Sequence, residues 1–367
     1  MRLGVAAALV EGSLLPGDVA VEEGLVSAVG LSPAGRGGLA APGFVDVQVN
    51  GFAGVDFLAA DPAGYQQARE ALARTGVTAF QPTLISSPLG VFTEALASLA
   101  AAGRGGTGSR LLPAHLEGPF ISPLHHGAHN PANLIAADIE CADALCAAGP
   151  VGYLTVAPEI DGGLALVEHL AGRGLIVSLG HSDAAAEVAT AAYNRGARAA
   201  THIFNAMRRW MPRDPGLAGV ALTRPDVFVT AIVDNVHLAP ETSRIILAAT
   251  RGRLVLITDA IEAAALGDGT YQLGDRQVQV RGLEARLADG TLAGSVLSMD
   301  QAVRNLVDLG AGLDAALRAA SRTPARLLRR TDLGELRPGV TADVIVLDDS
   351  LQVRRTLVGG EEAWARG

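Results

Sequence analysis

Apolar segments with strong β-propensity recur along the chain, and segments of helical character separate them. Eight are predicted to form buried strands, at residues 43–50, 77–84, 111–117, 152–158, 175–181, 197–204, 227–233 and 254–259. Helices are predicted at residues 62–74, 91–101, 138–148, 163–172, 184–194, 240–250, 298–309 and 313–329. Apolar strands that alternate with helices are typical of a parallel sheet with both faces covered. We therefore predict an α/β fold with a (β/α)8 TIM-like barrel.

An open, doubly wound sheet is the main alternative for this alternation. No Gly-x-Gly-x-x-Gly sequence follows any of the predicted strands, so a dinucleotide-binding version of that fold has no support. The barrel remains the preferred prediction.

Both ends of the chain carry short β-like segments divided by glycine and proline. These segments lie at residues 3–10, 17–22, 24–30, 342–347 and 351–358. Because chain termini often lie close together, the two ends are expected to pair. We predict a small β-sandwich domain from residues 1–41 and 332–367 and a catalytic barrel from residues 42–331. A polar, alternating segment with an Asp-Gly turn predicts a β-hairpin insert near residues 270–294.

The absence of lysine excludes several kinds of catalysis and binding site. All 29 residues counted as Lys+Arg are arginines, which excludes Schiff-base catalysis, a P-loop lysine and a carbamylated lysine between two metals. The net charge is −9 without a basic patch, which argues against nucleic acid as a partner.

The expected location is the cytoplasm. No apolar run approaches the roughly 18 residues that span a membrane, and Glu11 directly follows the apolar residues 3–10, which favours a first strand over a signal peptide. Cys141 and Cys146 fall on one predicted helix and indicate no disulfide framework.

Polar side chains gather where the predicted strands end. Glu117 ends the third strand, and Gly118-Pro119 stops the strand directly after it. A buried carboxylate needs a cation, a metal or a proton as its partner. Other strands end in His181, His202, Asn205, Asp234, His237 and Asp259. Since chemistry in such a barrel is carried out at the carboxyl ends of the strands, these side chains are expected to meet.

Taken singly, each of these residues has an ordinary structural explanation. A lone histidine is usually hydrogen-bonded, Asp259 could cap a helix, and Asn205 could occupy a turn. Together, however, Glu117, His181 and His202 offer one carboxylate and two imidazoles, which suit Zn²⁺ with one position open for water. Asp259 can serve as the base for that water. The combination favours a metallohydrolase.

Seven motifs between residues 42 and 260 are more specific, and the resemblance that they carry extends over about residues 42–360. They are Pro42-Gly43-Phe44-Val45-Asp46, His115-Leu116-Glu117-Gly118-Pro119-Phe120, His129-Asn130-Pro131, Gly180-His181-Ser182, Thr201-His202-Ile203-Phe204-Asn205-Ala206-Met207, Pro215-Gly216-Leu217-Ala218-Gly219 and Thr258-Asp259-Ala260. With them the chain resembles the N-acetylglucosamine-6-phosphate deacetylases of the amidohydrolase superfamily. The resemblance implies metal-dependent hydrolysis of the acetamide of N-acetylglucosamine 6-phosphate, in amino-sugar catabolism and cell-wall recycling.

The resemblance also implies roles for individual residues. Glu117, His181 and His202 would be metal ligands and Asp259 the catalytic acid and base. Further residues would bind substrate: His129 at the acetyl carbonyl oxygen, Asn205 and the Ala206 backbone at the sugar phosphate, His237 and Arg213. Arg213 would bind the phosphate, in some members from the partner subunit, which implies a homodimer.

Two departures from the family pattern affect the metal site and the seventh strand. Most amidohydrolases carry His-x-His at the end of the first strand, where this chain has Gln48-Val49-Asn50. Because amides are poor ligands, we expect one divalent metal per subunit, Zn²⁺ first, with Fe²⁺ and Co²⁺ as alternatives. Asn235 replaces the usual glycine before His237, and asparagine tolerates the positive φ of that turn.

Three other functions fit parts of the pattern. A deacetylase for N-acetylgalactosamine 6-phosphate, or an amidohydrolase for a related amide such as a cyclic one, would use the same metal and aspartate. A non-catalytic barrel that binds a sugar phosphate would not need both the ligand set and Asp259.

Overall fold

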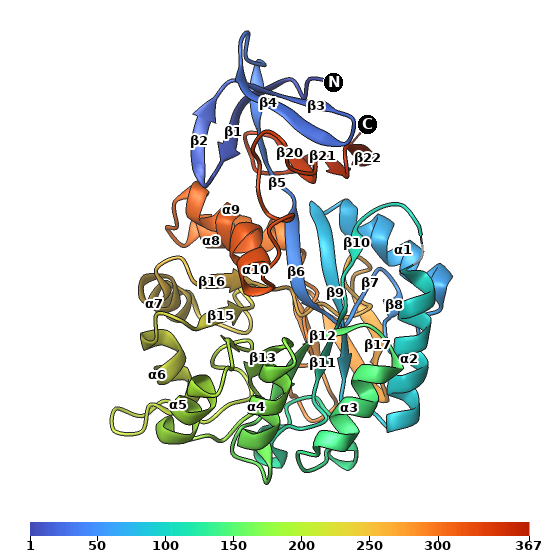
Figure 1. Ribbon diagram of the computed structural model, residues 1–367, viewed down its shortest axis with the longest axis vertical. Coiled ribbons are helices and arrows are strands. Elements are labelled where there is room, and N and C mark those ends of the chain that lie inside the picture. Colours follow the sequence, from blue (N-terminus) through green and yellow to red (C-terminus); the bar gives the residue numbers. More distant parts are fainter. Residues whose placement is uncertain (104, 367) are drawn as a thin grey trace.

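The computed structural model describes residues 1–103 and 105–366. Its larger part is a barrel of parallel strands surrounded by helices (Figure 1). The barrel strands are β6 (Phe44–Val49), β9 (Val77–Ile85), β11 (Ala114–Glu117), β12 (Val151–Val156), β13 (Ile176–Leu179), β14 (Ala199–Ala200), β15 (Phe228–Ala231) and β16 (Leu254–Leu256). All eight coincide with predicted strands, which confirms the (β/α)8 prediction.

The strands follow one another around the barrel in chain order. Parallel pairing joins β6 to β9 and continues without a crossover from β9 to β16. The last strand returns to the first through a parallel bridge between Val49 and Ala260. The Asp259 N–H also donates to the Gln48 carbonyl at 2.9 Å. This closure brings the ends of the first and eighth strands together.

Most of the helices lie where the sequence predicts them. They are α1 (Pro62–Ala73), α2 (Leu89–Ala102), α3 (Ile139–Ala148), α4 (Gly163–Gly172), α5 (Ala186–Asn194), α6 (Gly216–Thr223), α7 (Pro240–Thr250), α8 (Met299–Asp308), α9 (Leu313–Ala320) and α10 (Arg322–Leu327). Short elements complete the barrel: β7 (Gly51–Phe52), β8 (Val55–Asp56), β10 (Arg110–Leu111) and the 3-10 turns η1 (Pro123–His125) and η2 (Pro131–Asn133). Among the described helices, none combines the length and the apolar character needed to cross a bilayer.

Two helical segments differ from the prediction. Helix α6 was not predicted, because most of its residues are buried and no polar face marks a helical period. The single helix predicted over residues 313–329 is two helices that meet at Ser321. Pro324 explains the break, since a proline ring would clash with the carbonyl four residues earlier in a continuous helix.

A small β domain is built from both ends of the chain. One sheet has the order β2-β1-β5-β20-β21-β22, and β3 pairs with β4 in a second sheet. Its strands are β1 (Val5–Val10), β2 (Ser13–Pro16), β3 (Asp18–Glu22), β4 (Leu25–Leu31), β5 (Gly37–Pro42), β20 (Val344–Leu347), β21 (Val353–Val358) and β22 (Glu361–Ala365). A separate apolar cluster, which includes Val5, Val19 and Val344, forms its core. Figure 1 shows both termini on this domain, and β6 runs away from it into the barrel.

The insert after β16 contains the β-hairpin expected near residues 270–294 and extends it by one strand. Strands β17 (Gly269–Leu273) and β18 (Arg276–Arg281) form the hairpin, and the antiparallel strand β19 (Glu284–Arg286) pairs with β18. The third strand is only three residues long, so it gives almost no alternation to detect. Leu273 at the end of β17 reaches the cavity described next.

Candidate active site

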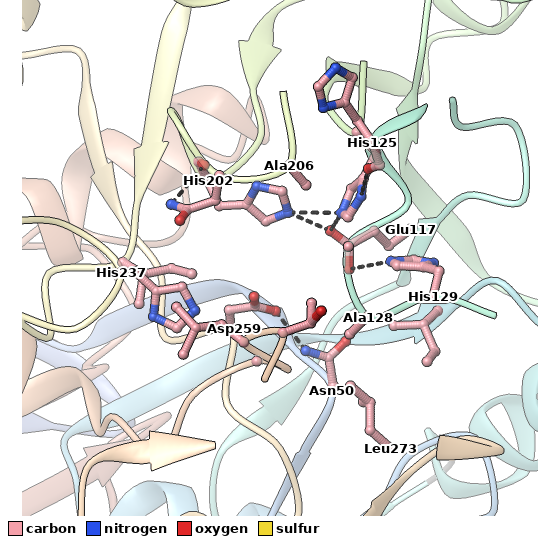
Figure 2. Close-up of a pocket in the computed structure, with 18 of the residues that line it drawn as sticks. Asn50, Glu117, His125, Ala128, His129, His202, Ala206, His237, Asp259 and Leu273 are labelled. Atoms are coloured by element: carbon pink, nitrogen blue, oxygen red, sulfur yellow. Dashed lines mark hydrogen bonds and ion pairs between the residues drawn. The ribbon is translucent and has the colours of Figure 1, made fainter. Parts of the chain in front are cut away.

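A cavity of about 370 Å³ opens at the carboxyl ends of the barrel strands (Figure 2). Eight of the nine residues proposed from the sequence line it: Glu117, His129, His181, His202, Asn205, Ala206, His237 and Asp259. Arg213 is the ninth; it is exposed and does not line the cavity of its own chain. The barrel therefore brings together side chains from its third, fifth, sixth, seventh and eighth strands.

Glu117 lies at the centre of this group, and two histidines approach one of its oxygens. Nε2 of His202 is 2.9 Å and Nε2 of His181 is 3.2 Å from Glu117 Oε1. Burial opposes a charge on Glu117, but the close imidazoles of His129, His181 and His202 hold its pKa well below the usual value. The carboxylate is therefore charged at neutral pH.

The two imidazoles are arranged to hold a cation. Nδ1 of His181 donates to the backbone oxygen of His125 at 2.9 Å, and burial together with His129 lowers the pKa of His181 to about 4. Its Nε2 therefore keeps a free lone pair that points at Glu117. The Nε2 atoms of His181 and His202 are only 3.1 Å apart, a separation that requires a cation or proton between the lone pairs. One carboxylate and two imidazoles suit a divalent metal with a position open for water.

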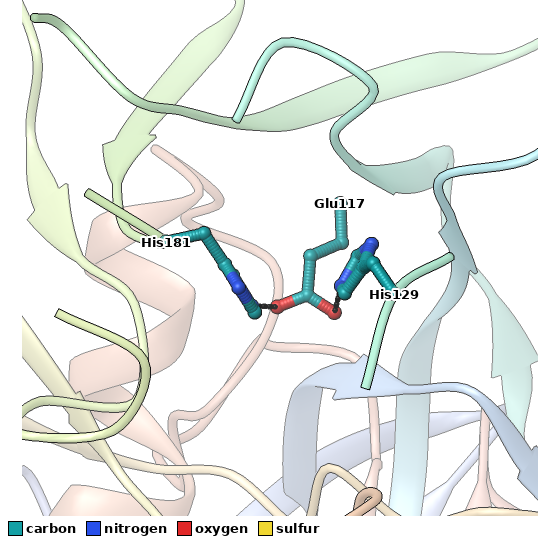
Figure 3. A group of neighbouring side chains, drawn as sticks. All are labelled: Glu117, His129 and His181. Carbon is teal, nitrogen blue, oxygen red and sulfur yellow. Dashed lines mark hydrogen bonds and ion pairs between the residues drawn. The ribbon is translucent and has the colours of Figure 1, made fainter. Parts of the chain in front are cut away.

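Figure 3 shows His129 at the other oxygen of the same carboxylate, across from His181. Its Nε2 is 3.7 Å from Glu117 Oε2, and the Ser86 N–H donates to its Nδ1 at 3.2 Å. In a neutral ring whose Nδ1 accepts, Nε2 carries the proton. Glu117, His129 and His181 also form a buried group within metal-binding distance, but a protonated nitrogen is no ligand. The hydrogen bonds thus favour His202 as the third ligand and His129 as a donor.

Asp259 faces this centre from the eighth strand. Two amides donate to the same oxygen, Oδ1: Asn50 Nδ2 at 2.6 Å and Gln48 Nε2 at 3.1 Å. Burial, helped by the charge of Glu117, raises the pKa of Asp259 to about 6. A carboxyl group with a pKa near neutrality can both take and return a proton at working pH.

The backbone at the strand ends is in an unusual conformation. Positive φ angles occur at His181 (48°), His202 (28°), Ala206 (45°) and Asp259 (51°). This region is unfavourable for residues with a Cβ atom, and such conformations cluster at functional sites. Asn235, at 63°, confirms the expected positive φ in the turn before His237.

His237 is fixed by the aspartate three residues before it. Asp234 Oδ2 accepts from Nδ1 of His237 at 2.7 Å, and Asp234 Oδ1 accepts from the His237 N–H at 2.8 Å. Burial would raise the pKa of Asp234, but these bonds hold it below the usual value. The charged carboxylate keeps a proton on Nδ1, so Nε2 of His237 faces the cavity.

The remaining end of the cavity carries amide groups and no arginine. Asn205 is held by bonds from its Nδ2 to the carbonyls of His202 and Ile203. No backbone hydrogen bond within the described residues uses the Ala206 N–H. Arg208, the nearest basic neighbour in sequence, is already paired with Asp183 and Asp214. This end can therefore bind an anion through the Ala206 N–H, but a full counter-charge must come from elsewhere.

Two functional contacts were missed from the sequence. Ser86, which sets the proton of His129, directly follows β9 and could have been found by the same strand-end rule. Gln48 and Asn50 were considered only as poor metal ligands, and their bonds to Asp259 depend on barrel closure, which no local pattern reveals.

Asp46 allows a test of the electrostatics beneath the cavity. This fully buried carboxyl accepts from Thr258 Oγ1 at 2.6 Å, and burial raises its pKa to about 7. Between pH 4 and pH 7 the folded state therefore holds a proton on Asp46 more often than the unfolded state does. The contribution of this group to the free energy of unfolding of the unmodified protein then falls as the pH rises through this range. Asp46→Asn should therefore become more stable relative to the unmodified protein from pH 5 to pH 8, by at most about 1.4 kcal/mol per pH unit. Urea unfolding at both pH values measures the difference, and a difference that does not change with pH would contradict the expectation.

Comparison with known proteins places this site in a wider context. Residues 39–363 match the amidohydrolase family. The chain is 40% identical to an N-acetylglucosamine-6-phosphate deacetylase of Bos taurus, over 89% of this chain and 84% of that protein. It is 37% identical to an N-acetylgalactosamine-6-phosphate deacetylase of Escherichia coli O157:H7, over 89% and 88%. A mutant N-acetyl-D-glucosamine-6-phosphate deacetylase of Mycobacterium smegmatis, solved with N-acetyl-D-glucosamine-6-phosphate, superposes with a TM-score of 0.94 at 34% identity over 99% of both chains.

Proposed function

The chain belongs to the amidohydrolase family, and on this basis we propose that it deacetylates N-acetylglucosamine 6-phosphate. The products are glucosamine 6-phosphate and acetate, in amino-sugar catabolism and cell-wall recycling. The observation that carries the proposal is the meeting of Glu117, His181 and His202 with Asp259 in one cavity. The relatives of known name act on hexosamine phosphates of this kind.

Glu117, His181 and His202 would hold one divalent metal per subunit. Zn²⁺ suits two neutral imidazoles and a carboxylate best, and Fe²⁺ or Co²⁺ could bind the same ligands. When bound, such a metal polarises the substrate carbonyl and makes a water nucleophilic at neutral pH. Gln48 and Asn50 donate their amide nitrogens to carboxylates, and amide oxygens are poor ligands for such a metal, so we do not expect a second tightly bound ion.

The residues of the chain itself carry the protons and the developing charge. Asp259 takes the proton of the attacking water through its unbonded oxygen Oδ2, and later returns it to the departing amine nitrogen. The Nε2–H of His129 donates to the acetyl oxygen as that oxygen becomes negative. No second acid is required, because one carboxyl with a raised pKa serves in both directions.

The phosphate would bind at the amide end of the cavity, to Asn205, the Ala206 N–H and His237. Its remaining charge would be neutralised by Arg213 of a second subunit. Arg213 is exposed and forms no ion pair with any described residue. On the same loop Trp210 and Met211 are 43% and 58% exposed, as expected at a subunit interface. We therefore propose a homodimer.

Arg213→Ala should remove the preference for phosphorylated substrate. A guanidinium–phosphate fork is a strong, charge-assisted contact, so we expect KM for the sugar phosphate to rise about 100-fold, with little change for the unphosphorylated sugar. Mixed dimers test the origin of Arg213. At a sugar-phosphate concentration far below KM, the Arg213→Ala and Asp259→Asn homodimers should both be nearly inactive. When the two are mixed and re-associate, about half of the dimers contain one subunit of each kind, and each of these should have one intact site. No recovery would place Arg213 in its own chain's site.

The galacto epimer is the second candidate substrate, because the Escherichia coli relative is named for it. Both epimers present the same acetamide and phosphate, so Glu117, Asp259 and Asn205 would act identically on either. Hydrolysis of another related amide would likewise retain the metal and Asp259, but would leave the phosphate contacts without a role.

Acetate release by the purified, metal-analysed protein tests the proposal. N-acetylglucosamine 6-phosphate, its galacto epimer and the unphosphorylated sugar are compared in one assay. Fast turnover of the first alone, with about one metal per chain, is the expected result. Faster turnover of the galacto epimer would reassign the substrate, and no release from any of the three would refute the proposal.

We also propose that the enzyme acts in the cytoplasm. Cys141 and Cys146 are both free thiols of intermediate exposure, and unpaired cysteines of this kind are usual in a reducing compartment.

A further inference from the structure

Gln48 and Asn50, which we call the amide clamp, connect the two carboxylates of the site. Nε2 of Gln48 donates to Glu117 Oε1 at 2.9 Å and to Asp259 Oδ1 at 3.1 Å. Nδ2 of Asn50 donates to the same Oδ1 at 2.6 Å. Two like charges in a buried site repel each other, and the clamp places amide hydrogens on both of them. Neutral donors thus occupy the strand end where other amidohydrolases can place two histidines.

The clamp makes the two oxygens of Asp259 inequivalent. Both amides donate to Oδ1, and no described residue donates to Oδ2. A carboxylate held through one oxygen cannot turn freely, and Oδ2 remains as the proton acceptor. Since Asp259 is only 8% exposed, water does not readily replace a lost amide donor.

The side-chain oxygen of Asn50 has no partner within the described part of the protein. The amide must point its nitrogen at Asp259, because an oxygen in that place would lie 2.6 Å from another oxygen. Asn50 is 3% exposed and lines the cavity, yet its Oδ1 has no hydrogen-bond partner among the described residues. A buried acceptor without a partner is costly, and because this one belongs to a residue that lines the cavity, a donor group of a bound ligand can satisfy it. Gln48 is 1% exposed and does not line the cavity.

We propose that Asn50 accepts a hydrogen bond from the acetamide N–H of the substrate, while Gln48 and Asn50 together position Asp259. This inference rests on the proposed deacetylase function. The Asn50 side chain would then contact both the acetamide nitrogen, which leaves as the amine, and Asp259, the carboxyl group that protonates that nitrogen. Gln48 is a positioning residue only, because it contacts Asp259 and Glu117 and does not line the cavity.

Two near-isosteric variants separate these roles. Gln48→Met removes one of the two donors of the clamp without touching substrate, and we expect kcat to fall about 100-fold with KM and the metal content unchanged. Asn50→Leu removes the other donor and the substrate contact. The comparison uses the amide substrate and its 2-O-acetyl ester analogue, which lacks the N–H. The amide-to-ester ratio of kcat/KM should fall about tenfold further in Asn50→Leu than in Gln48→Met.

Gln81→Met is the matched control. Gln81 is a buried amide on β9 whose Nε2 donates to the Pro113 carbonyl, away from the cavity, so its loss should leave turnover unchanged. If the amide-to-ester ratio of kcat/KM fell equally in Gln48→Met and Asn50→Leu, the proposed contact between Asn50 and the substrate N–H would be wrong. Unchanged kcat in Gln48→Met, or loss of the metal from either variant, would overturn the positioning role.

The unmodified protein in the same assay tests the proposed function separately. A crystal structure of the double variant Gln48→Met, Asn50→Leu, which lacks both donors to Asp259 Oδ1, tests the clamp whatever the substrate is. We expect the Asp259 carboxylate to have rotated, and an unchanged orientation would overturn the clamp.

Discussion

Asp259→Asn is expected to lower the turnover of N-acetylglucosamine 6-phosphate by about 10²–10⁴-fold, the usual contribution of a general acid–base group. The asparagine can keep an oxygen toward the amides of Gln48 and Asn50, so the backbone and the clamp should persist. An amide nitrogen would then replace Oδ2, which removes the only atom placed to take the proton of the water. The metal should stay bound, because Glu117, His181 and His202 are untouched.

Turnover and metal content, measured on the same preparation, decide this prediction. Asp18→Asn is the matched control, since Asp18 is also a buried aspartate that accepts several hydrogen bonds, but in the small β domain. That control should lose stability and keep its kcat. An Asp259→Asn enzyme with full activity would remove Asp259 from the mechanism, and a metal-free one would make it a ligand instead of a base.

The architecture could be predicted because it depends on a repeated, local signal. Each barrel strand is a short apolar run, and buried parallel strands need apolar residues on both faces. Elements without such a signal were missed or misjudged. Helix α6 is buried around most of its circumference, β19 has only three residues, and the junction between α9 and α10 depends on one proline.

The site could be predicted for a related reason. Once Glu117, His181, His202 and Asp259 are assigned to the carboxyl ends of strands, any closed parallel barrel places them on the same face. The direction of each hydrogen bond was not predictable. Whether His129 donates or binds metal depends on the Ser86 N–H, and the orientation of Asn50 depends on the closure between β6 and the eighth strand. These are contacts between distant segments, which spacing does not encode.

Replacing His202 by asparagine is expected to empty the metal site and abolish deacetylation. Its Nε2 lies 2.9 Å from Glu117 Oε1 and 3.1 Å from His181 Nε2, where it would complete the proposed set of ligands. Metal binding should weaken by more than the roughly 10–100-fold typical for loss of an outer contact. Elemental analysis after dialysis measures the metal, and acetate release measures the activity.

His129→Asn gives the discriminating comparison, because Glu117, His129 and His181 form the competing group of ligands. If the Ser86 N–H keeps the proton on Nε2 of His129, this variant should retain one metal per chain and lose turnover, since only the donor to the acetyl oxygen is gone. The two histidines are equally buried, at 3% and 4% exposure, so a difference in metal content reports ligation and not packing. Metal lost from His129→Asn and kept by His202→Asn would reverse the two assignments, and His129 would then have to bind the metal through a ring whose proton has moved to Nδ1.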